Sequence, residues 1–175
     1  MIQFFKKKRY PKFWQEHLDK VQNSQKYSNF ENIRFVAIDT ETTGFDYEND
    51  RILCIGAVAI KNNKILVPDA FEIYLKQDVF SKETVKIHGI RKNGNEEKLS
   101  EEEAIIKFLD YLDDAVIVAH HTAFDVNMIN QALKRLKVGP LESKQLDTNY
   151  IHKKIAKTDT YKKIFSLEEL CEIYN

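Results

Sequence analysis

Residues 33–44, with the sequence Ile-Arg-Phe-Val-Ala-Ile-Asp-Thr-Glu-Thr-Thr-Gly, join an apolar run to a compact group of acidic and hydroxyl side chains. The apolar part, residues 33–39, is rich in β-forming residues and predicts a buried strand. Asp39 and Glu41 stand at its end, and Gly44 then lets the chain turn away sharply. The stretch therefore predicts a strand that carries two carboxylates to the edge of a sheet.

A second apolar run predicts a neighbouring strand. Residues 52–60 are again rich in β-formers, and they end at the turn-forming pair Asn62-Asn63. We expect a hairpin here, with the chain continuing as a strand into residues 64–67 or 71–75.

Helical signals follow the hairpin. Ser100-Glu101-Glu102-Glu103 has the form of a capping box. The buried face predicted behind it consists of Ala104, Ile105, Phe108, Leu109 and Leu112. Residues 116–119 indicate a short buried strand, residues 124–136 a helix that stops near Gly139-Pro140, and residues 166–169 the start of a last helix. Strands first, then alternating helix and strand, predict an α/β fold with a mixed sheet flanked by helices.

Composition limits the size and the partners of the protein. The 175 residues, 43% hydrophobic and 31% charged, suffice for one domain with a real core. Lys plus Arg equals Asp plus Glu at 27 each, so any nucleic-acid site must be local. No apolar run approaches the roughly 20 residues that span a bilayer, and the two cysteines lack the spacing of a zinc site or disulfide scaffold. We expect a cytoplasmic chain with no membrane partner.

The first 31 residues differ from the rest because they contain no strand-like run. Pro11 can open a helix, and Trp14, Leu18 and Val21 recur at helical spacing. We therefore expect a helical leader over residues 1–31 and a main domain over residues 32–175. The apolar stripe of the leader is expected to dock either on that domain or on a partner.

Asp39 and Glu41 are the first candidates for chemistry. Side chains two apart on a strand point to the same face, and two converging carboxylates raise each other's pKa unless a cation lies between them. A divalent cation is the usual solution, but an ordinary polar strand end explains the pair equally well. Thr40 and Thr42 offer hydroxyl and backbone N–H groups to a terminal nucleotide.

A second acidic site follows the strand at residues 116–119. Here the chain reads His120-His121-Thr122-Ala123-Phe124-Asp125. Taken alone, Asp125 is better explained as a first-turn residue that favours the helix dipole behind an N-cap at Thr122. Because both acidic sites follow short apolar strands, however, adjacent parallel strands would bring Asp39, Glu41 and Asp125 to one sheet edge, where ligands gather in α/β folds.

Two further polar positions have both structural and functional interpretations. Asp147 follows a short run, and we favour a role in capping the helix that begins around Asn149. His88 precedes Gly89 at the end of a helical stretch. Substrate contact by His88 and simple termination of the helix at Gly89 are equally good interpretations.

Taken in order, these residues resemble the DEDD superfamily of 3′ to 5′ exonucleases, in the branch that contains the proofreading epsilon subunit of bacterial DNA polymerase III. Asp39 to Gly44 matches the motif Asp-x-Glu-Thr-Thr-Gly. Ala119 to Asp125 is similar to Ala-His-Asn-x-x-Phe-Asp, with His121 where Asn is usual. The shorter elements of the family match at residues 88–90, 147–148 and 166–171.

The resemblance implies a ribonuclease-H-like sheet in which Asp39, Glu41 and Asp125 are catalytic and hold two Mg²⁺ or Mn²⁺ ions about 4 Å apart. It implies hydrolysis of DNA from a single-stranded or frayed 3′ end, in proofreading or repair, with release of nucleoside 5′-monophosphates. The residues expected to contact the terminal nucleotide are Thr40, Thr42, His88, His120 and Phe124.

One motif of the family is absent. It consists of His followed five positions later by Asp, normally lies beyond the segment matched at residues 166–171, and supplies the general base. We therefore assign no general base, and expect either that the protein continues past Asn175 or that this form is non-catalytic. Two other functions fit the same sequence: trimming of RNA 3′ ends, and a non-catalytic module that tethers a DNA polymerase.

Overall fold

A computed structural model describes residues 10–23, 30–79, 82–92, 94–156 and 163–175. Its centre is a six-stranded sheet with the order β4-β3-β2-β1-β5-β6. The strands are β1 (Phe35–Thr42), β2 (Ile52–Lys61), β3 (Lys64–Leu75), β4 (Lys98–Leu99), β5 (Val116–Ala119) and β6 (Gln145–Asp147). β1, β2 and β3 are antiparallel, whereas β5 runs parallel to β1 and β6 parallel to β5. This mixed sheet confirms the predicted fold class.

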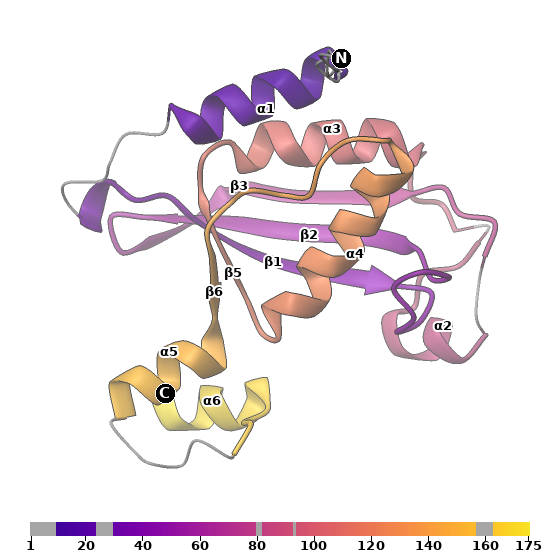
Figure 1. Ribbon diagram of the computed structural model, residues 1–175. Helices are drawn as coiled ribbons and strands as arrows, with labels where there is room; N and C mark the ends of the chain where they lie inside the picture. Colours follow the sequence, from indigo (N-terminus) through magenta and orange to yellow (C-terminus); the bar gives the residue numbers. More distant parts are fainter. Residues whose placement is uncertain (1–9, 24–29, 80–81, 93, 157–162) are drawn as a thin grey trace, which may run out of the picture.

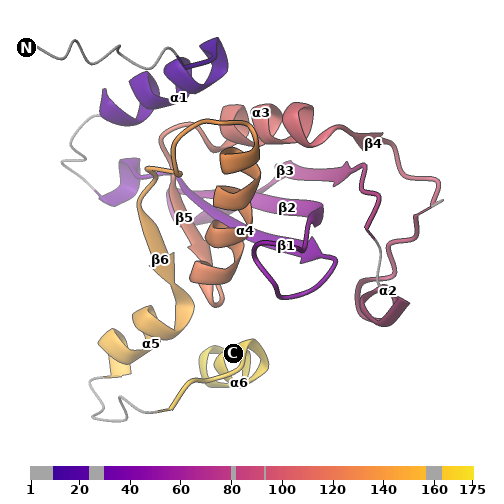
Figure 2. The same cartoon turned by 45° about the vertical axis from the view of Figure 1, so that its right-hand side comes forward.

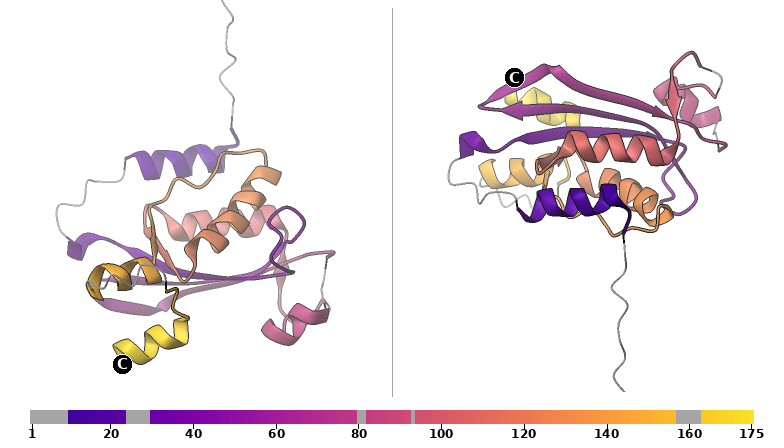
Figure 3. Two further views of the ribbon diagram at one scale, coloured as in Figure 1. Left: turned by 60° about the horizontal axis from the view of Figure 1, so that its bottom comes forward. Right: turned by 90° about the horizontal axis from the view of Figure 1, so that it is seen from above.

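The helices lie mainly on one face of the sheet. They are α1 (Lys12–Gln22), α2 (Lys82–His88), α3 (Glu101–Leu112), α4 (Thr122–Arg135), α5 (Thr148–Ala156) and α6 (Leu167–Tyr174). Figures 1 and 3 show α3 and α4 against the sheet and α1 outside α3, whereas α5 and α6 form a separate pair beyond the end of β6. Figure 2 shows α2 near the end of β1, on the side of the molecule away from α5.

Strand β1 lies between β2 and β5 and sorts its side chains by alternation. Val36, Ile38 and Thr40 are buried beneath the helices, and the intervening residues are more exposed. Val36 is part of the main hydrophobic core, together with Phe108 of α3 and Ile129 of α4. Burying apolar side chains on one face leaves the alternate residues of β1, among them Asp39 and Glu41, on the other face.

Most predicted elements are present, with shifted ends. β1 begins at Phe35 rather than residue 33, because a 3₁₀ turn, η1 (Phe30–Asn32), precedes it. β3 is continuous from Lys64 to Leu75 and contains both of the segments proposed for the returning strand. Asn62 and Asn63 both have positive φ, at 52° and 57°, which is the backbone that a two-residue hairpin turn requires.

The leader contains the expected helix, and Pro11 stands at its N-cap. Trp14 is 1% exposed and belongs to the main core. A Cβ atom added at Gly139 would lie 3.4 Å from the Trp14 ring, so the ring packs within van der Waals reach of this segment. Helix α1 therefore docks on the domain itself, which is one of the two alternatives expected from the sequence. Residues 1–9 and 24–29 of the predicted leader lie outside the described residues.

Within the described ranges, no helix combines the length and the apolar composition that crossing a bilayer demands.

Helix α3 depends on its capping box, in which the Ser100 side chain accepts from the Glu103 backbone and the Glu103 side chain accepts from the Ser100 N–H. We expect Ser100→Ala to lower the free energy of unfolding by about 1 kcal/mol, because an N–H group at the helix start loses its acceptor. Urea unfolding measures this change. Lys107→Ala, an exposed substitution on the same helix, should stay within about 0.5 kcal/mol. Equal effects would contradict a specific capping role.

Candidate active site

The carboxyl end of β1 presents Asp39 and Glu41 on the face opposite the helical layer. Asp39 is exposed and Glu41 is half-buried, whereas Thr40 between them is 7% exposed and points toward the helices. Strand alternation thus produces the arrangement expected from the sequence, with both carboxylates on one face.

Asp125 reaches β1 from the first turn of α4. Its side chain is 3% exposed. Its Oδ1 atom accepts a hydrogen bond from the Thr40 backbone N–H at 3.0 Å and another from the Thr40 hydroxyl at 2.8 Å. These bonds place the Asp125 carboxyl group beside the carboxyl end of β1, as the parallel pairing of β1 and β5 led us to expect.

The helix start is built differently from the predicted N-cap. His121, not Thr122, is the N-cap residue of α4, and it has left-handed backbone angles with φ 59°. The Thr122 N–H donates to Asp147 Oδ2 at 3.0 Å, and its hydroxyl donates to the carbonyl oxygens of Ala119 and Leu146. The prediction of Thr122 as N-cap was therefore wrong, because tertiary partners from β6 replace a local cap.

Asp147 is a capping residue, as favoured from the sequence. Its Oδ1 atom accepts from the N–H groups of Asn149 and Tyr150 at 2.8 and 3.2 Å, at the start of α5. Because Oδ2 bonds Thr122 at the same time, one carboxylate joins the first turns of α4 and α5. It thereby helps to hold the helix that carries Asp125.

The three predicted acidic residues influence one another electrostatically. Burial raises the pKa of Asp125 to about 6; the hydrogen bond from the Thr40 side chain opposes this shift, and the charge of Asp39 adds to it. Burial also raises the pKa of Glu41, again with a contribution from Asp39, whereas His88 lowers it. Asp39 thus acts on both other carboxyl groups, and a cation beside it would relieve the repulsion.

The donor chemistry of the three residues suits a hard divalent cation, which prefers carboxylate oxygens. Within the described ranges, no three His, Cys, Asp or Glu side chains stand in an arrangement that could hold a metal ion. Asp125 is engaged with Thr40, while Asp39 and Glu41 lie on the more exposed face of β1. A carboxylate has about four lone-pair sites, so the two bonds from Thr40 leave Asp125 acceptor capacity for a ligand.

His88 ends α2 and lies near Glu41, as its effect on the pKa of Glu41 requires. Its Nδ1 atom accepts the Ile90 N–H at 3.0 Å, so the neutral ring carries its proton on Nε2. Nε2 is buried and has no hydrogen-bond partner among the described residues. Gly89, with φ 74°, ends the helix, as one of the two interpretations of this segment predicted. Contact of His88 with a substrate stays a prediction.

The remaining predicted substrate residues make hydrogen bonds within the protein. The Thr42 hydroxyl donates to the Gly44 carbonyl oxygen at 2.8 Å, and Thr40 is committed to Asp125 as described. His120 Nδ1 lies 2.7 Å from the Thr148 hydroxyl. In this structure Thr40 and Thr42 therefore order the site, and their contact with a nucleotide stays a prediction, as does that of His120.

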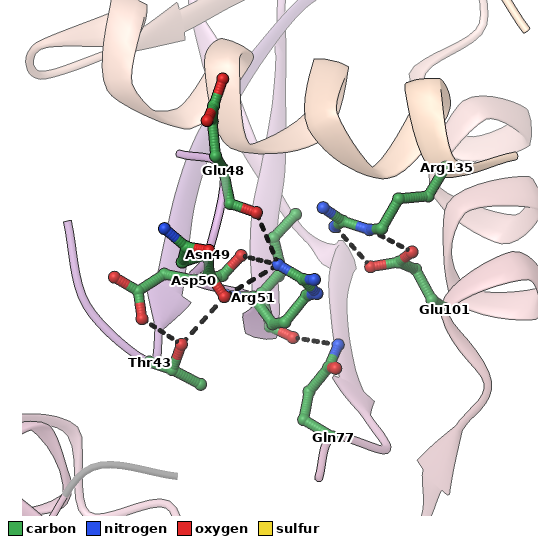
Figure 4. A network of polar contacts seen from close by, with 9 residues as sticks. Thr43, Glu48, Asn49, Asp50, Arg51, Gln77, Glu101 and Arg135 are labelled. Atoms are coloured by element: carbon green, nitrogen blue, oxygen red, sulfur yellow. Dashed lines mark hydrogen bonds and ion pairs between the residues drawn. The ribbon is translucent and has the colours of Figure 1, made fainter. Parts of the chain in front are cut away.

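The loop after β1 is held by a dense set of hydrogen bonds (Figure 4). Asp50 accepts from the Thr43 hydroxyl at 2.6 Å and from the Asp46 N–H at 2.9 Å. The Arg51 guanidinium donates to the carbonyl oxygens of residues 48, 49 and 50. A Cβ atom added at Gly44 would lie 2.4 Å from Asp50 Oδ2, so a side chain there would push the Asp50 carboxylate out of these bonds.

This loop places two aromatic side chains beside Phe124. The ring centroids of Phe45 and Tyr47 each lie 5.7 Å from that of Phe124. Phe45 is 79% exposed and Tyr47 38% exposed. We call Phe45, Tyr47 and Phe124 the aromatic cluster. Sequence reasoning found only Phe124, although two aromatic residues within three positions of Gly44 were an available signal.

Comparisons with known proteins agree with this geometry. A family model for exonucleases, RNase_T, matches residues 36–175. The chain is 34% identical over 142 residues to the PolC-type DNA polymerase III of Thermotoga petrophila, which covers 81% of this chain and 10% of that protein. It is 34% identical over 110 residues to the DNA polymerase III subunit epsilon of Escherichia coli, covering 59% of this chain and 45% of that protein. The chain thus spans less than half the length of either relative.

A solved structure shares the fold. E. coli exonuclease I in complex with a dA16 oligonucleotide superimposes with a TM-score of 0.68 at 15% identity, over 81% of this chain and 36% of that chain.

The raised pKa of Asp125 makes stability depend on pH. The folded protein holds this proton more tightly than the unfolded chain, so the stabilisation is present at low pH and is lost as pH rises from about 4 through about 6. The change from 3.8 to about 6 corresponds to at most about 3 kcal/mol. Asp125→Asn keeps an oxygen acceptor for Thr40 without this ionisation.

The unsubstituted protein should lose this stabilisation as pH rises, whereas Asp125→Asn should not. We therefore expect the free energy of unfolding of Asp125→Asn minus that of the unsubstituted protein to rise by about 1–3 kcal/mol from pH 4 to pH 7.5. Urea titrations at both pH values provide the measurement. Asp78→Asn, at an exposed position, controls for the general loss of one carboxyl group. A difference for Asp125→Asn that does not change with pH would contradict the assigned ionisation.

Proposed function

This chain belongs to the RNase_T exonuclease family, and we propose that it hydrolyses phosphodiester bonds of DNA from the 3′ end and releases nucleoside 5′-monophosphates. The observation that supports the proposal is the bonding of Asp125 to Thr40, the residue between Asp39 and Glu41, together with the charge of Asp39, which raises the pKa of both other groups. Carboxyl groups brought together against their own repulsion are characteristic of a site that is completed by a cation.

Exonucleases of this family use divalent metal ions, and Asp39, Glu41 and Asp125 are the residues that would hold them here, as two Mg²⁺ or Mn²⁺ ions. The ions would neutralise charge on the phosphoryl oxygens and favour ionisation of the attacking water. The chain itself contributes the positions of the carboxylates. Thr40 fixes Asp125 through two hydrogen bonds, and Asp147 anchors the helix that carries it.

The aromatic cluster supports a single-stranded or frayed 3′ end as the substrate. Phe45 and Tyr47 are exposed next to Phe124, on a loop whose backbone is held by Asp50 and Arg51. Bases that are not paired can stack on such rings, and stacking tolerates any sequence. His88 would add a hydrogen-bond donor through Nε2 if the terminal nucleotide reached it.

A role in proofreading or repair is suggested by the two sequence relatives, both of which are DNA polymerase III proteins. By extension from them, a DNA polymerase is the partner we propose. The same role would place the chain in the cytoplasm, beside the DNA it acts on.

The first test replaces one carboxylate. We expect Asp39→Asn to lower the turnover of a 3′-labelled DNA oligonucleotide by orders of magnitude in Mn²⁺, and to weaken Mn²⁺ binding in calorimetry, because the charge of Asp39 acts on both other acids. Asp78→Asn serves as the matched control. Full Mn²⁺ binding and full turnover in Asp39→Asn would contradict the assignment.

The same assay distinguishes the other functions. Release of nucleotides from an RNA oligomer but not from DNA would replace DNA by RNA as the substrate. Tight Mn²⁺ binding with intact DNA and RNA, in a protein that carries every segment of its natural sequence, would favour a non-catalytic module that tethers a polymerase.

The second test concerns the aromatic cluster. We expect Phe45→Ala to raise KM for single-stranded DNA about tenfold, because one stacked base contributes about 1–3 kcal/mol. Phe30→Ala is the matched control, since Phe30 is also exposed, at 63%, but precedes the opposite end of β1. Steady-state kinetics give the result, and equal KM changes in the two variants would argue against a stacking surface.

A further inference from the structure

His17 of α1 is buried without a hydrogen-bond partner. Its side chain is 3% exposed, and neither Nδ1 nor Nε2 bonds any of the described residues. A neutral imidazole has one N–H donor and one acceptor nitrogen. Burying both unpaired costs about 1–3 kcal/mol for each group, so this position is expensive even for the neutral ring.

The surroundings of His17 make a charged ring more costly still. On its inner side is Trp14, whose ring centroid lies 5.2 Å from that of His17 and which belongs to the main core. The charged groups that act on His17 are Lys20 of α1, and Asp110 and Asp113 at the end of α3. Lys20 already pairs with both aspartates, at 3.4 and 3.7 Å, so their negative charge is partly neutralised.

Together these effects lower the pKa of His17. Burial lowers the pKa of His17 below its ordinary 6.5, Lys20 lowers it further, and Asp113 and Asp110 oppose the shift. A docked α1 therefore binds the His17 proton less readily than a released α1, in which the ring is hydrated. Docking is fully stabilised where the ring is neutral in both forms, above its ordinary pKa of 6.5, and weakens as pH falls below that value until the docked ring is itself protonated.

Helix α1 is an outer layer, and its attachment rests on the packing of Phe13, Trp14 and Leu18 and on the ion pairs of Lys20. It lies over α3, outside the layer that covers the sheet (Figures 1 and 3). Trp14 packs against Gly139, and the ion pairs of Lys20 are largely exposed and thus weak. The strand pairing of β1 with β2 and β5 does not involve α1.

From these observations we propose that α1 is a pH-sensitive latch, in which protonation of His17 releases the helix from α3 while the sheet stays folded. Release would expose the apolar side of α1, which includes Phe13, Trp14 and Leu18. The latch is independent of the proposed nuclease activity, because His17 touches none of the residues assigned to it.

The chain carries its own reporter of this movement. Trp14 is the single tryptophan, and its emission maximum moves to longer wavelength when the ring becomes hydrated. The maximum is the quantity to follow between pH 8 and pH 5, since intensity also responds to quenching by a protonated imidazole. Far-UV circular dichroism on the same samples follows the folded sheet.

We expect the emission maximum to shift with a midpoint below pH 6.5, and the shift to be absent in His17→Leu, whose apolar side chain cannot take up the proton. His17→Gln, also without a titrating ring, gives a second measurement if the leucine variant folds poorly. His152→Gln is the matched control, because His152 is another buried histidine but bonds the Tyr174 hydroxyl at 3.0 Å within the α5–α6 pair.

Three outcomes would overturn the latch. The first is an emission maximum that does not move down to pH 5. The second is an equal shift in the unsubstituted protein and both His17 variants, which also share the ionisation of Asp125. The third is a shift that coincides with loss of the circular dichroism signal, because global unfolding would then explain it.

Discussion

The hydrogen bonds from Thr40 to Asp125 are the interaction on which the site depends. They join the middle of the sheet to the first turn of α4, across 85 residues of sequence. Thr40 can make them because strand alternation turns it toward the helices and Asp39 and Glu41 toward the opposite face. A single strand therefore supplies two carboxylates and the anchor for a third.

This arrangement carries an electrostatic cost. Burial and the charge of Asp39 hold the pKa of Asp125 at about 6, even though two hydrogen bonds from Thr40 favour its ionised form. The fold tolerates this electrostatic cost because the polar groups around the site make hydrogen bonds. Asp147 caps two helices at once, and Asp50 and Arg51 bond the loop that follows β1. Such pre-organised carboxylates are what a phosphodiester-cleaving site requires.

Helix α1 forms a layer outside α3. Its largest side chain, Trp14, completes the main core, yet both nitrogens of its neighbour His17 are buried without a hydrogen bond to any residue that the structure describes. The sheet is held by strand pairing and by the faces of α3 and α4, whereas α1 adds an outer layer with one well-packed ring and exposed ion pairs. The proposed latch therefore concerns this outer layer alone and leaves the paired strands of the sheet in place.

By itself the sequence determined most of the elements and nominated Asp39, Glu41 and Asp125 as the candidate site. The buried face of α3, the capping box at Ser100 and the start of the last helix at Ser166 are present as predicted. These features depend on residues a few positions apart, through the periods of helix and strand and the geometry of a first turn. The family resemblance, confirmed by the match over residues 36–175, rests on the same local motifs.

Only the tertiary structure decided which distant groups meet. It assigned Thr40 to Asp125, replaced the expected Thr122 cap by a bond to Asp147, and brought Phe45 and Tyr47 to Phe124. It also left His17 buried without a hydrogen-bond partner in the described part of the chain, which no helical pattern indicates. The physical reason is that hydrogen-bond partners and burial are properties of the packed layers, and local periodicity specifies a face without specifying what lies against it.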